Sequence, residues 1–124
     1  MTAAVVLTPV SAPVADHVLV AALDGALDYT NAELLRRDVE ALLGEGHHEL
    51  VLDLSGVGFC DSTGIRILLS VRKLLQERDG AVTLAAPSDR LAKIFRVTGL
   101  ISAFTIAPSL AEALDVVGAR SNPR

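Results

Sequence analysis

Aromatic side chains are scarce in this sequence. The 124 residues include three phenylalanines, one tyrosine and no tryptophan, so aromatics make up 3% of a chain that is 51% apolar. The core must therefore consist mainly of leucine, valine, isoleucine and alanine, with Phe59, Phe95 and Phe104 as the only large rings that we expect to be buried. Such a core is typical of helices packed on a sheet. At this length we expect one domain over residues 1–124.

Cysteine is limited to one residue, Cys60, which excludes an internal disulfide. A chain without disulfides fits a reducing compartment, and we expect a cytoplasmic location. Cys60 lies between Phe59 and Asp61 at the end of an apolar run. We interpret it as a small packing residue rather than a reactive thiol.

Long apolar runs and clusters of basic residues are also missing. The first Lys or Arg is Arg36, and Pro9 and Pro13 interrupt the apolar N-terminus, so neither a signal peptide nor a membrane span of about 18 apolar residues is predicted. With 11 basic and 15 acidic side chains, the formal net charge is −4. The absence of a basic cluster disfavours direct binding of nucleic acid.

Several signatures of enzymes and metal sites are incomplete. The Asp61–Gly64 segment occurs once and has one residue more than the Asp-Ser/Thr-Gly of aspartic proteases, which need two carboxylates. Ser62 lacks the Gly-x-Ser-x-Gly surroundings of many serine hydrolases, and Gly56-Val57-Gly58 is not followed by a lysine at P-loop spacing. His47-His48 is interpreted as a solvated turn. We therefore predict no enzyme and assign no metal, nucleotide or other cofactor.

The pattern of apolar residues predicts alternating strands and helices. Prolines place the first strand at an edge, and the opening pair can be antiparallel, whereas strand–helix–strand units give parallel neighbours. The predicted fold is α/β, with a mixed sheet of about five strands and about four helices packed against it. Strands are expected over 4–10, 17–23, 49–54, 81–86 and 104–106, and helices over 30–43, from 61 or 62 to about 77, over 88–99 and over 108–118, with 120–124 frayed.

Local signals define the ends of the helices. Thr30 to Glu33 reads as a capping box, with Tyr29 and Leu34 as a hydrophobic staple. Ser88 begins a helix that Gly99 ends, and Ser109 with Glu112 forms a second capping box. Asp24-Gly25 is interpreted as a turn.

The joint between the third strand and the following helix is the most plausible functional site. Asp61 or Ser62 is expected to cap the helix, and the helical period places Ser62 on the polar side, in line with Arg66. The Ser62 hydroxyl should therefore face solvent. A phosphate there would be tolerated by the helix N-terminus; Arg66 would attract it and Asp61 would repel it.

Three segments together resemble the signature segments of STAS domains and, more narrowly, of the stand-alone bacterial anti-sigma factor antagonists. They are Gly25 to Asp28 (GALD), Asp61 to Gly64 (DSTG) and Leu91 to Leu100 (LAKIFRVTGL). They occur in the family's order and spacing, and the resemblance extends from about residue 17 to 117.

The resemblance implies a partner-switching protein. In such a protein the unphosphorylated antagonist binds an anti-sigma factor that is also a Ser/Thr kinase, and this releases a sigma factor. Phosphorylation at the position of Ser62 abolishes binding, and a PP2C-type phosphatase reverses it. The expected partner-binding residues are Asp28, Asp61, Ser62, Thr63, Gly64 and Arg66.

Alternatives stay open at several of these residues. Asp28 either caps its own loop or lies near Ser62, because loops that follow neighbouring parallel strands gather at one edge. Thr63 is interpreted as a structural residue of the helix start, and Gly64 as a site where another backbone approaches closely. The alternative function is a non-phosphorylated STAS subunit of a lipid-transport or stressosome-type complex. The oligomeric state is also open.

Overall fold

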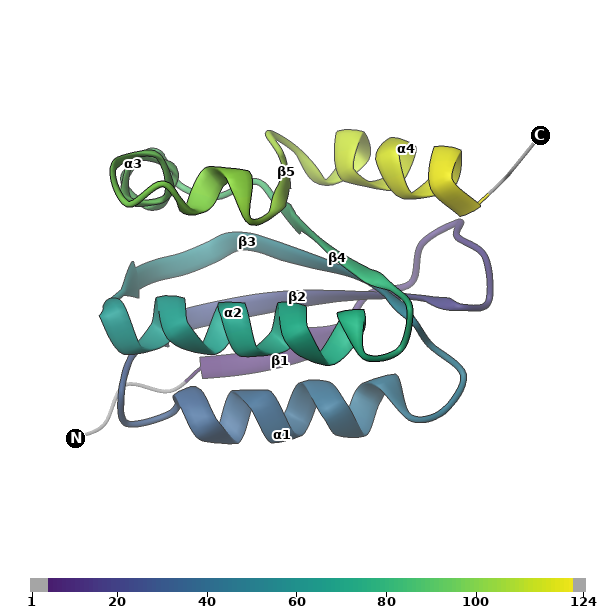
Figure 1. Cartoon of the computed structure of the whole chain (residues 1–124), viewed down its shortest axis with the longest axis horizontal. Helices are drawn as coiled ribbons and strands as arrows, with labels where there is room; N and C mark the ends of the chain where they lie inside the picture. The colour runs from purple at the N-terminus through teal and green to yellow at the C-terminus, as the bar shows by residue number, and fades with distance from the viewer. Residues whose placement is uncertain (1–4, 122–124) are drawn as a thin grey trace.

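Five strands and four α-helices make up the described part of the chain (Figure 1). The computed structural model describes residues 5–121, and the side chains of residues 6–119. The order along the chain is β1 (Val5–Pro9), β2 (Val18–Leu27), α1 (Ala32–Leu43), β3 (Glu49–Cys60), α2 (Ser62–Gln76), β4 (Ala81–Ala85), α3 (Asp89–Val97), the 3-10 helix η1 (Leu100–Ser102), β5 (Thr105–Ala107) and α4 (Leu110–Ser121).

The sheet has the strand order β1-β2-β3-β4-β5. β1 pairs with β2 antiparallel, and the three remaining pairs are parallel. Each parallel pair is joined by a crossover that contains a helix, because parallel neighbours cannot be joined by a short hairpin. The predicted α/β fold, its mixed sheet and the edge position of the first strand are confirmed.

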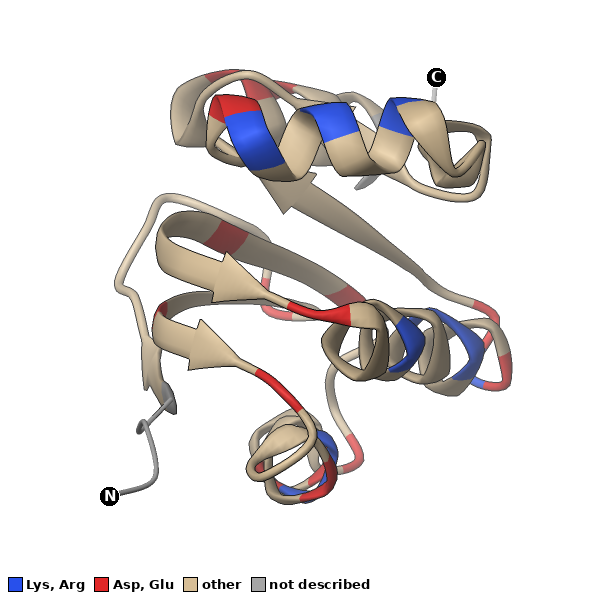
Figure 2. Cartoon of the chain, turned by 90° about the vertical axis from the view of Figure 1, so that its left-hand side faces the viewer, with Lys and Arg blue, Asp and Glu red and all other residues tan. Residues whose placement is uncertain are grey.

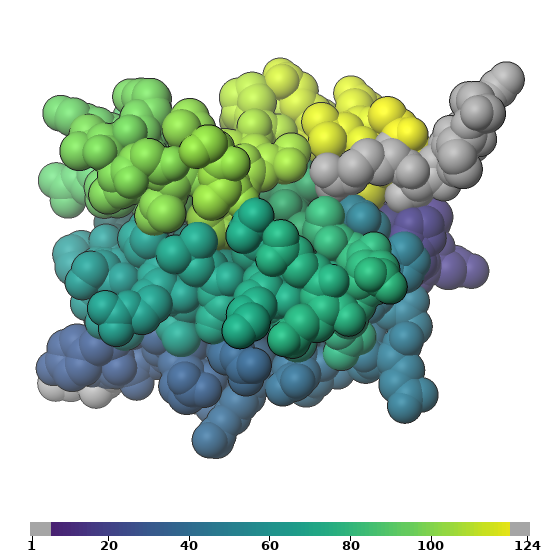
Figure 3. All heavy atoms as spheres, in the orientation of Figure 1, coloured from purple at the N-terminus to yellow at the C-terminus, as the bar shows by residue number. Residues whose placement is uncertain are grey.

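Two apolar clusters pack against the sheet because side chains alternate along each strand. In β3, Leu50, Leu52 and Leu54 join the larger cluster, which includes residues of α1, α2 and α3. Val51 joins the smaller cluster, which includes Ala113 and Val117 of α4. A strand that is buried on both faces in this way has a nearly continuous apolar sequence. Figure 3 shows α2 across the front of the molecule, with α1 below it and the α3–η1 segment above it.

Two of the three phenylalanines are buried, as predicted. Phe95 is fully buried and Phe104 is 8% exposed, and their ring centroids lie 5.8 Å apart. The prediction for Phe59 is wrong, because its side chain is 49% exposed. Phe59 lies near the end of β3, beyond the part of that strand that pairs with β4. The core is therefore even poorer in aromatic side chains than the sequence suggested.

Strands β2 and β3 extend further than the sequence predicted. β3 continues through Ser55-Gly56 to Cys60, and β2 continues through Asp24-Gly25, so the predicted turn there is wrong. The register shifts twice along this pair, and each shift inserts one extra residue into β3. β-Bulges of this kind accommodate Gly inside a strand and bend it. The ends of β2 and β3 therefore extend beyond the part of β3 that pairs with β4, and the candidate site lies at these ends.

The entry to α1 differs from the predicted capping box. The N-cap is Asn31 rather than Thr30, and no side chain of either residue caps the helix. The Asn31 amide instead donates to the Ala26 carbonyl at 2.7 Å. Tyr29 and Leu34, the predicted staple, are 77% and 59% exposed. Asn31 therefore holds the preceding loop, and its side chain does not cap the first turn of α1.

The later helices follow their predicted caps more closely. Ser88 Oγ accepts from Leu91 N at 3.1 Å, and Ser109 Oγ accepts from Glu112 N at 3.1 Å. Helix α4 continues past the predicted stop at Gly118 to Ser121, so residues 120 and 121 are helical, while 122–124 lie outside the described residues. Within residues 5–121, no helix is both long and apolar enough to cross a membrane.

Candidate functional site

The candidate site lies where the neighbouring parallel strands β2 and β3 end. Leu27 pairs with Cys60 at the last position of the ladder, and an aspartate follows each strand: Asp28 before α1 and Asp61 before α2. Figure 2 looks onto this end of the molecule and shows an acidic position after each of the two strands. The parallel register thus brings the ends of the two strands, which are 33 residues apart at Leu27 and Cys60, to one edge of the sheet.

Asp61 is the N-cap of α2, as one of the two predicted alternatives proposed. Its backbone is extended, and its Oδ1 accepts from Gly64 N at 2.9 Å. Its carbonyl accepts from Ile65 N at 3.0 Å, and its own N–H donates to the Leu27 carbonyl at 3.2 Å. Asp61 therefore joins the start of α2 to the end of β2, and this fixes the position of Ser62.

Ser62 is the first residue of α2, and it is exposed. The backbone N–H groups of Ser62 and Thr63 make no hydrogen bond within the described part of the chain. Free N–H groups at a helix N-terminus carry partial positive charge and favour an anion. The Ser62 hydroxyl is thus displayed to solvent beside two unused donors.

Arg66 lies one turn further along the same face of α2. It is exposed, as are Lys73 and Glu77 on the predicted polar side. Arg66 makes no ion pair within 4.0 Å among the described residues. Thr63, by contrast, is half-buried, which agrees with a structural position at the start of the helix.

Gly64 is buried against the end of β2, and its part in partner binding stays a prediction. A Cβ on Gly64 would lie 2.6 Å from the Leu27 carbonyl oxygen, 2.8 Å from Cys60 Sγ and 2.9 Å from Leu27 Cγ. The close backbone approach that the sequence suggested is therefore made within this chain. The contacts of Gly64 hold the start of α2, and with it Ser62, against the end of β2.

Asp28 organises its own loop. Asp28 Oδ1 accepts from Thr30 N at 2.9 Å and from Thr30 Oγ1 at 2.5 Å, and Asp28 N donates to Asn31 Oδ1 at 3.1 Å. These bonds form the loop cap that was one of the two alternatives. The contact of Leu27 with Gly64 places the Asp28 loop beside the start of α2.

Cys60 is a packing residue, as predicted. Burial, followed by the charge of Asp61, raises the pKa of the Cys60 thiol to about 12. A thiol with this pKa is protonated at neutral pH and is a poor nucleophile. Its sulfur lies against the space where Gly64 has no side chain.

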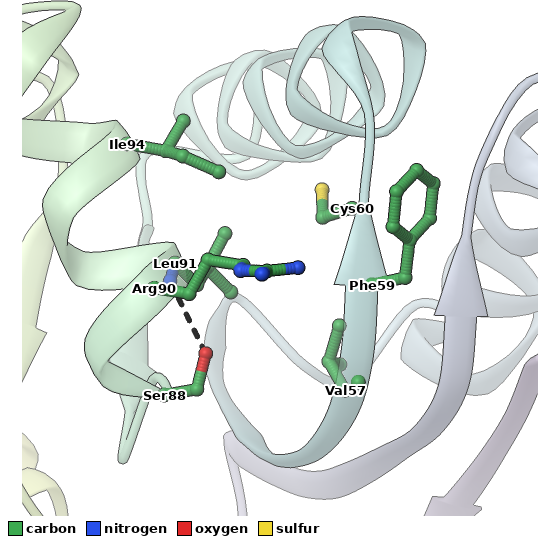
Figure 4. A pocket seen from close by; sticks show the side chains of 8 residues that line it. Val57, Phe59, Cys60, Ser88, Arg90, Leu91 and Ile94 are labelled. Atoms are coloured by element: carbon green, nitrogen blue, oxygen red, sulfur yellow. Dashed lines mark hydrogen bonds between the residues drawn. The ribbon is translucent and has the colours of Figure 1, made fainter.

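Two exposed aromatic side chains at this edge were missed as site residues. Tyr29 is 77% exposed and directly follows Asp28, and Phe59 is 49% exposed near the end of β3. In Figure 4, the Phe59 ring and Cys60 project from opposite sides of β3. Aromatic side chains are enriched at protein interfaces. The sequence feature that could have identified them is their position within two residues of Asp28 and Asp61.

The histidines lie away from this edge, at the start of β2 and β3. The rings of His17 and His48 stack with their centroids 4.5 Å apart, and His47 Nδ1 lies 2.9 Å from the Leu43 carbonyl. Among residues 5–121, no group of three or more His, Cys, Asp or Glu side chains is arranged to hold a metal ion.

Comparison with known proteins identifies the family. BtrV of Bordetella bronchiseptica, named as a candidate anti-sigma factor antagonist, is 32% identical over 94 residues, which are 76% of this chain and 81% of BtrV. The crystal structure of an anti-sigma factor antagonist from Mycobacterium paratuberculosis has a TM-score of 0.77 at 27% identity, covering 92% of this chain and 94% of that one.

The fold is also that of the anti-sigma factor antagonist SpoIIAA in its unphosphorylated form, with a TM-score of 0.72 at 22% identity, covering 96% of this chain and 100% of that one. These relatives are named as regulatory antagonists, which agrees with the prediction of a binding protein rather than an enzyme. Residues 9–113 match the STAS domain family itself. The chain therefore belongs to the STAS domain family.

Proposed function

We propose that this chain is an anti-sigma factor antagonist. Its unphosphorylated form binds an anti-sigma factor that is also a Ser/Thr kinase and thereby frees a sigma factor. Phosphorylation of Ser62 by that kinase abolishes binding, and a PP2C-type phosphatase restores it. The names of the relatives support the antagonist activity. The exposed Ser62 hydroxyl at the start of α2 is the observation that carries the switch.

The geometry allows the fold to accept the phosphate. The phosphate adds a charge of about −1.5 to −2 next to two backbone N–H groups that have no partner in the described part of the chain. Arg66, one turn along, offers a cation, and the cap of Gly64 N by Asp61 stays in place. The phosphorylated chain is therefore expected to keep its structure.

Binding is the step that the phosphate blocks. The proposed contact surface consists of Ser62 with Asp28, Asp61, Thr63, Gly64 and Arg66, and we add to it the exposed rings of Tyr29 and Phe59. Arg66 balances only part of the charge of about −1.5 to −2, and a partner pressed onto this surface removes water from the phosphate without supplying a second cation. An unpaired buried charge costs several kcal/mol, or about 10²-fold or more in affinity.

The test uses each anti-sigma factor kinase encoded in the source genome, purified and titrated against four forms of the chain. Ser62→Ala should bind at least as tightly as the natural chain and stay bound in the presence of ATP. Ser62→Asp and Ser62→Glu should bind about 10²-fold more weakly or worse while keeping their circular dichroism spectrum. Equal affinity of Ser62→Asp and Ser62→Ala would contradict the electrostatic switch.

Mass spectrometry after incubation with kinase and ATP locates the modified residue. Thr63→Ala is the matched control, because it removes the neighbouring hydroxyl. The natural chain and Thr63→Ala should gain one phosphate, and Ser62→Ala should gain none. Failure of every kinase to modify Ser62 would favour the alternative of a non-phosphorylated STAS subunit.

A further inference from the structure

Helix α3 carries a basic face that the Ser62 switch does not use. Arg90, Lys93 and Arg96 are exposed, and Asp89 is the only acidic residue of this helix, in a chain with a formal net charge of −4. The one ion pair within 4.0 Å among the described residues lies on α1. The cations of α3 therefore have no acidic partner in the part of the chain that the structure describes.

This helix lies at the same end of the molecule as the start of α2. Figure 2 looks onto that end, and the basic positions of α3 face the viewer above the ends of β2 and β3. Figure 1 shows the N-terminus of α2 and helix α3 at the same side of the molecule. One partner can therefore contact both.

A shallow hollow joins α3 to the end of β3. Its walls include Cys60 of β3 and Arg90 and Ile94 of α3, and its volume is about 10 Å³. A hollow of this size holds about one water molecule and is too small for a small-molecule ligand. Figure 4 shows the Arg90 side chain reaching from α3 across the hollow toward β3. Cys60 is the last residue of β3, so the hollow lies beside the strand that leads into the start of α2.

Apolar area accompanies the charge. Val97 is 76% exposed and lies seven residues after Arg90, which places the two side chains on one face of the helix. A valine beside cations gives a partner both an apolar contact and a charge contact. Interfaces combine an apolar centre with charges at the rim, and the rim charges set the association rate and its salt dependence.

We propose that the basic face of α3 docks an acidic segment of the same anti-sigma factor that recognises Ser62. The inference rests on the proposed function. It adds that the same partner makes a second contact, through acidic side chains, with α3. Charge complementarity supports a protein segment. Three cations on a chain of net charge −4 are too few to hold a polyanion such as duplex DNA or an anionic membrane against the overall repulsion.

The test compares two double variants with the same change in charge. R90E/K93E reverses the basic face, and R37E/K73E reverses two exposed cations on α1 and on the later turns of α2. Each is titrated against the purified anti-sigma factor kinases at about 0.05 M and about 0.5 M salt, because screening separates rim charges from other contacts. R90E/K93E should bind about tenfold or more weakly at low salt and within about threefold at high salt.

The control R37E/K73E should bind like the natural chain at both salt concentrations. Val97→Ser should weaken binding by a similar factor at low and high salt, because its contact is apolar. If a kinase binds the natural chain and both double variants equally, the inference about α3 is wrong and the proposed function stands. If no kinase binds the natural chain, the proposed function fails and the partner assignment fails with it. Loss of binding to duplex DNA or anionic vesicles in R90E/K93E, with kinase binding unchanged, would also overturn the inference.

Discussion

Replacing Gly64 by alanine tests how the start of α2 is positioned. The added Cβ would lie 2.6 Å from the Leu27 carbonyl oxygen and 2.8 Å from Cys60 Sγ, far inside the usual contact distance of about 3.5 Å or more. The Leu27 carbonyl also accepts the Asp61 N–H, so it is held in place from the same side. The end of β2 cannot move away without breaking the bond that anchors the cap of α2.

The magnitude follows from two opposing effects. Overpacking costs about 1–3 kcal/mol, and contact with a fixed backbone atom places this site near the upper limit. Alanine gains at most about 1 kcal/mol over glycine in a helix. We therefore expect Gly64→Ala to lower the free energy of unfolding by about 2 kcal/mol and the urea midpoint by about 1 M.

Gly58→Ala is the matched control for this substitution. Gly58 lies in β3, and no atom lies within 4 Å of a Cβ built on it. The free energy of unfolding of Gly58→Ala should stay within about 0.5 kcal/mol of that of the natural chain. Urea unfolding followed by circular dichroism measures all three proteins. Equal midpoints for Gly64→Ala and the natural chain would refute the close packing of α2 against β2.

Three further predictions concern the neighbouring residues. Burial raises the pKa of Cys60 to about 12 from an ordinary 9.0. Iodoacetamide at about pH 8 should therefore modify the folded chain up to roughly 10³-fold more slowly than the urea-unfolded chain. A ratio of the two modification rates below about ten would contradict the burial of the thiol. The same raised pKa means that the unfolded chain releases the thiol proton first, so the stability that Cys60 contributes is complete below about pH 9 and lost as the pH rises toward about 12. Urea unfolding across that pH range measures the effect. The free energy of unfolding of Cys60→Ser should fall less with rising pH than that of the natural chain. Asp61→Ala removes the side chain that caps Gly64 N and should lower the free energy of unfolding by about 1 kcal/mol, whereas Asp61→Asn should lower it less. An Asp61→Ala variant as stable as the natural chain would show that the cap contributes little.

Some local signals in the sequence were interpreted correctly, although the capping box at Thr30 and the helix stop at Gly118 were not. The helical period placed Ser62 on the polar side of α2. Residue type and spacing predicted the cap at Ser88, and gave Asp61 as one of two candidates for the cap of α2. These features depend on the backbone of the same helix. They are decided before any distant segment is in place.

Features that depend on distant partners were read less well. The turn at Asp24-Gly25 and the stop of the third strand after Leu54 were predicted from residue type alone, whereas pairing between β2 and β3 carries both strands further through two bulges. Phe59 was expected in the core because it is large and apolar, but its position near the end of β3 leaves it exposed.

The sequence by itself determined the alternation of strands and helices, the capped start of α2 and the outward direction of Ser62, because local hydrogen bonds and side-chain periodicity suffice for each. Only the tertiary structure decided that Gly64 packs on Leu27, that the Asp28 loop lies beside it, and that the cations of α3 stand at the same end of the molecule. Those placements depend on the register and length of strands that are far apart in the chain, and no local pattern encodes them.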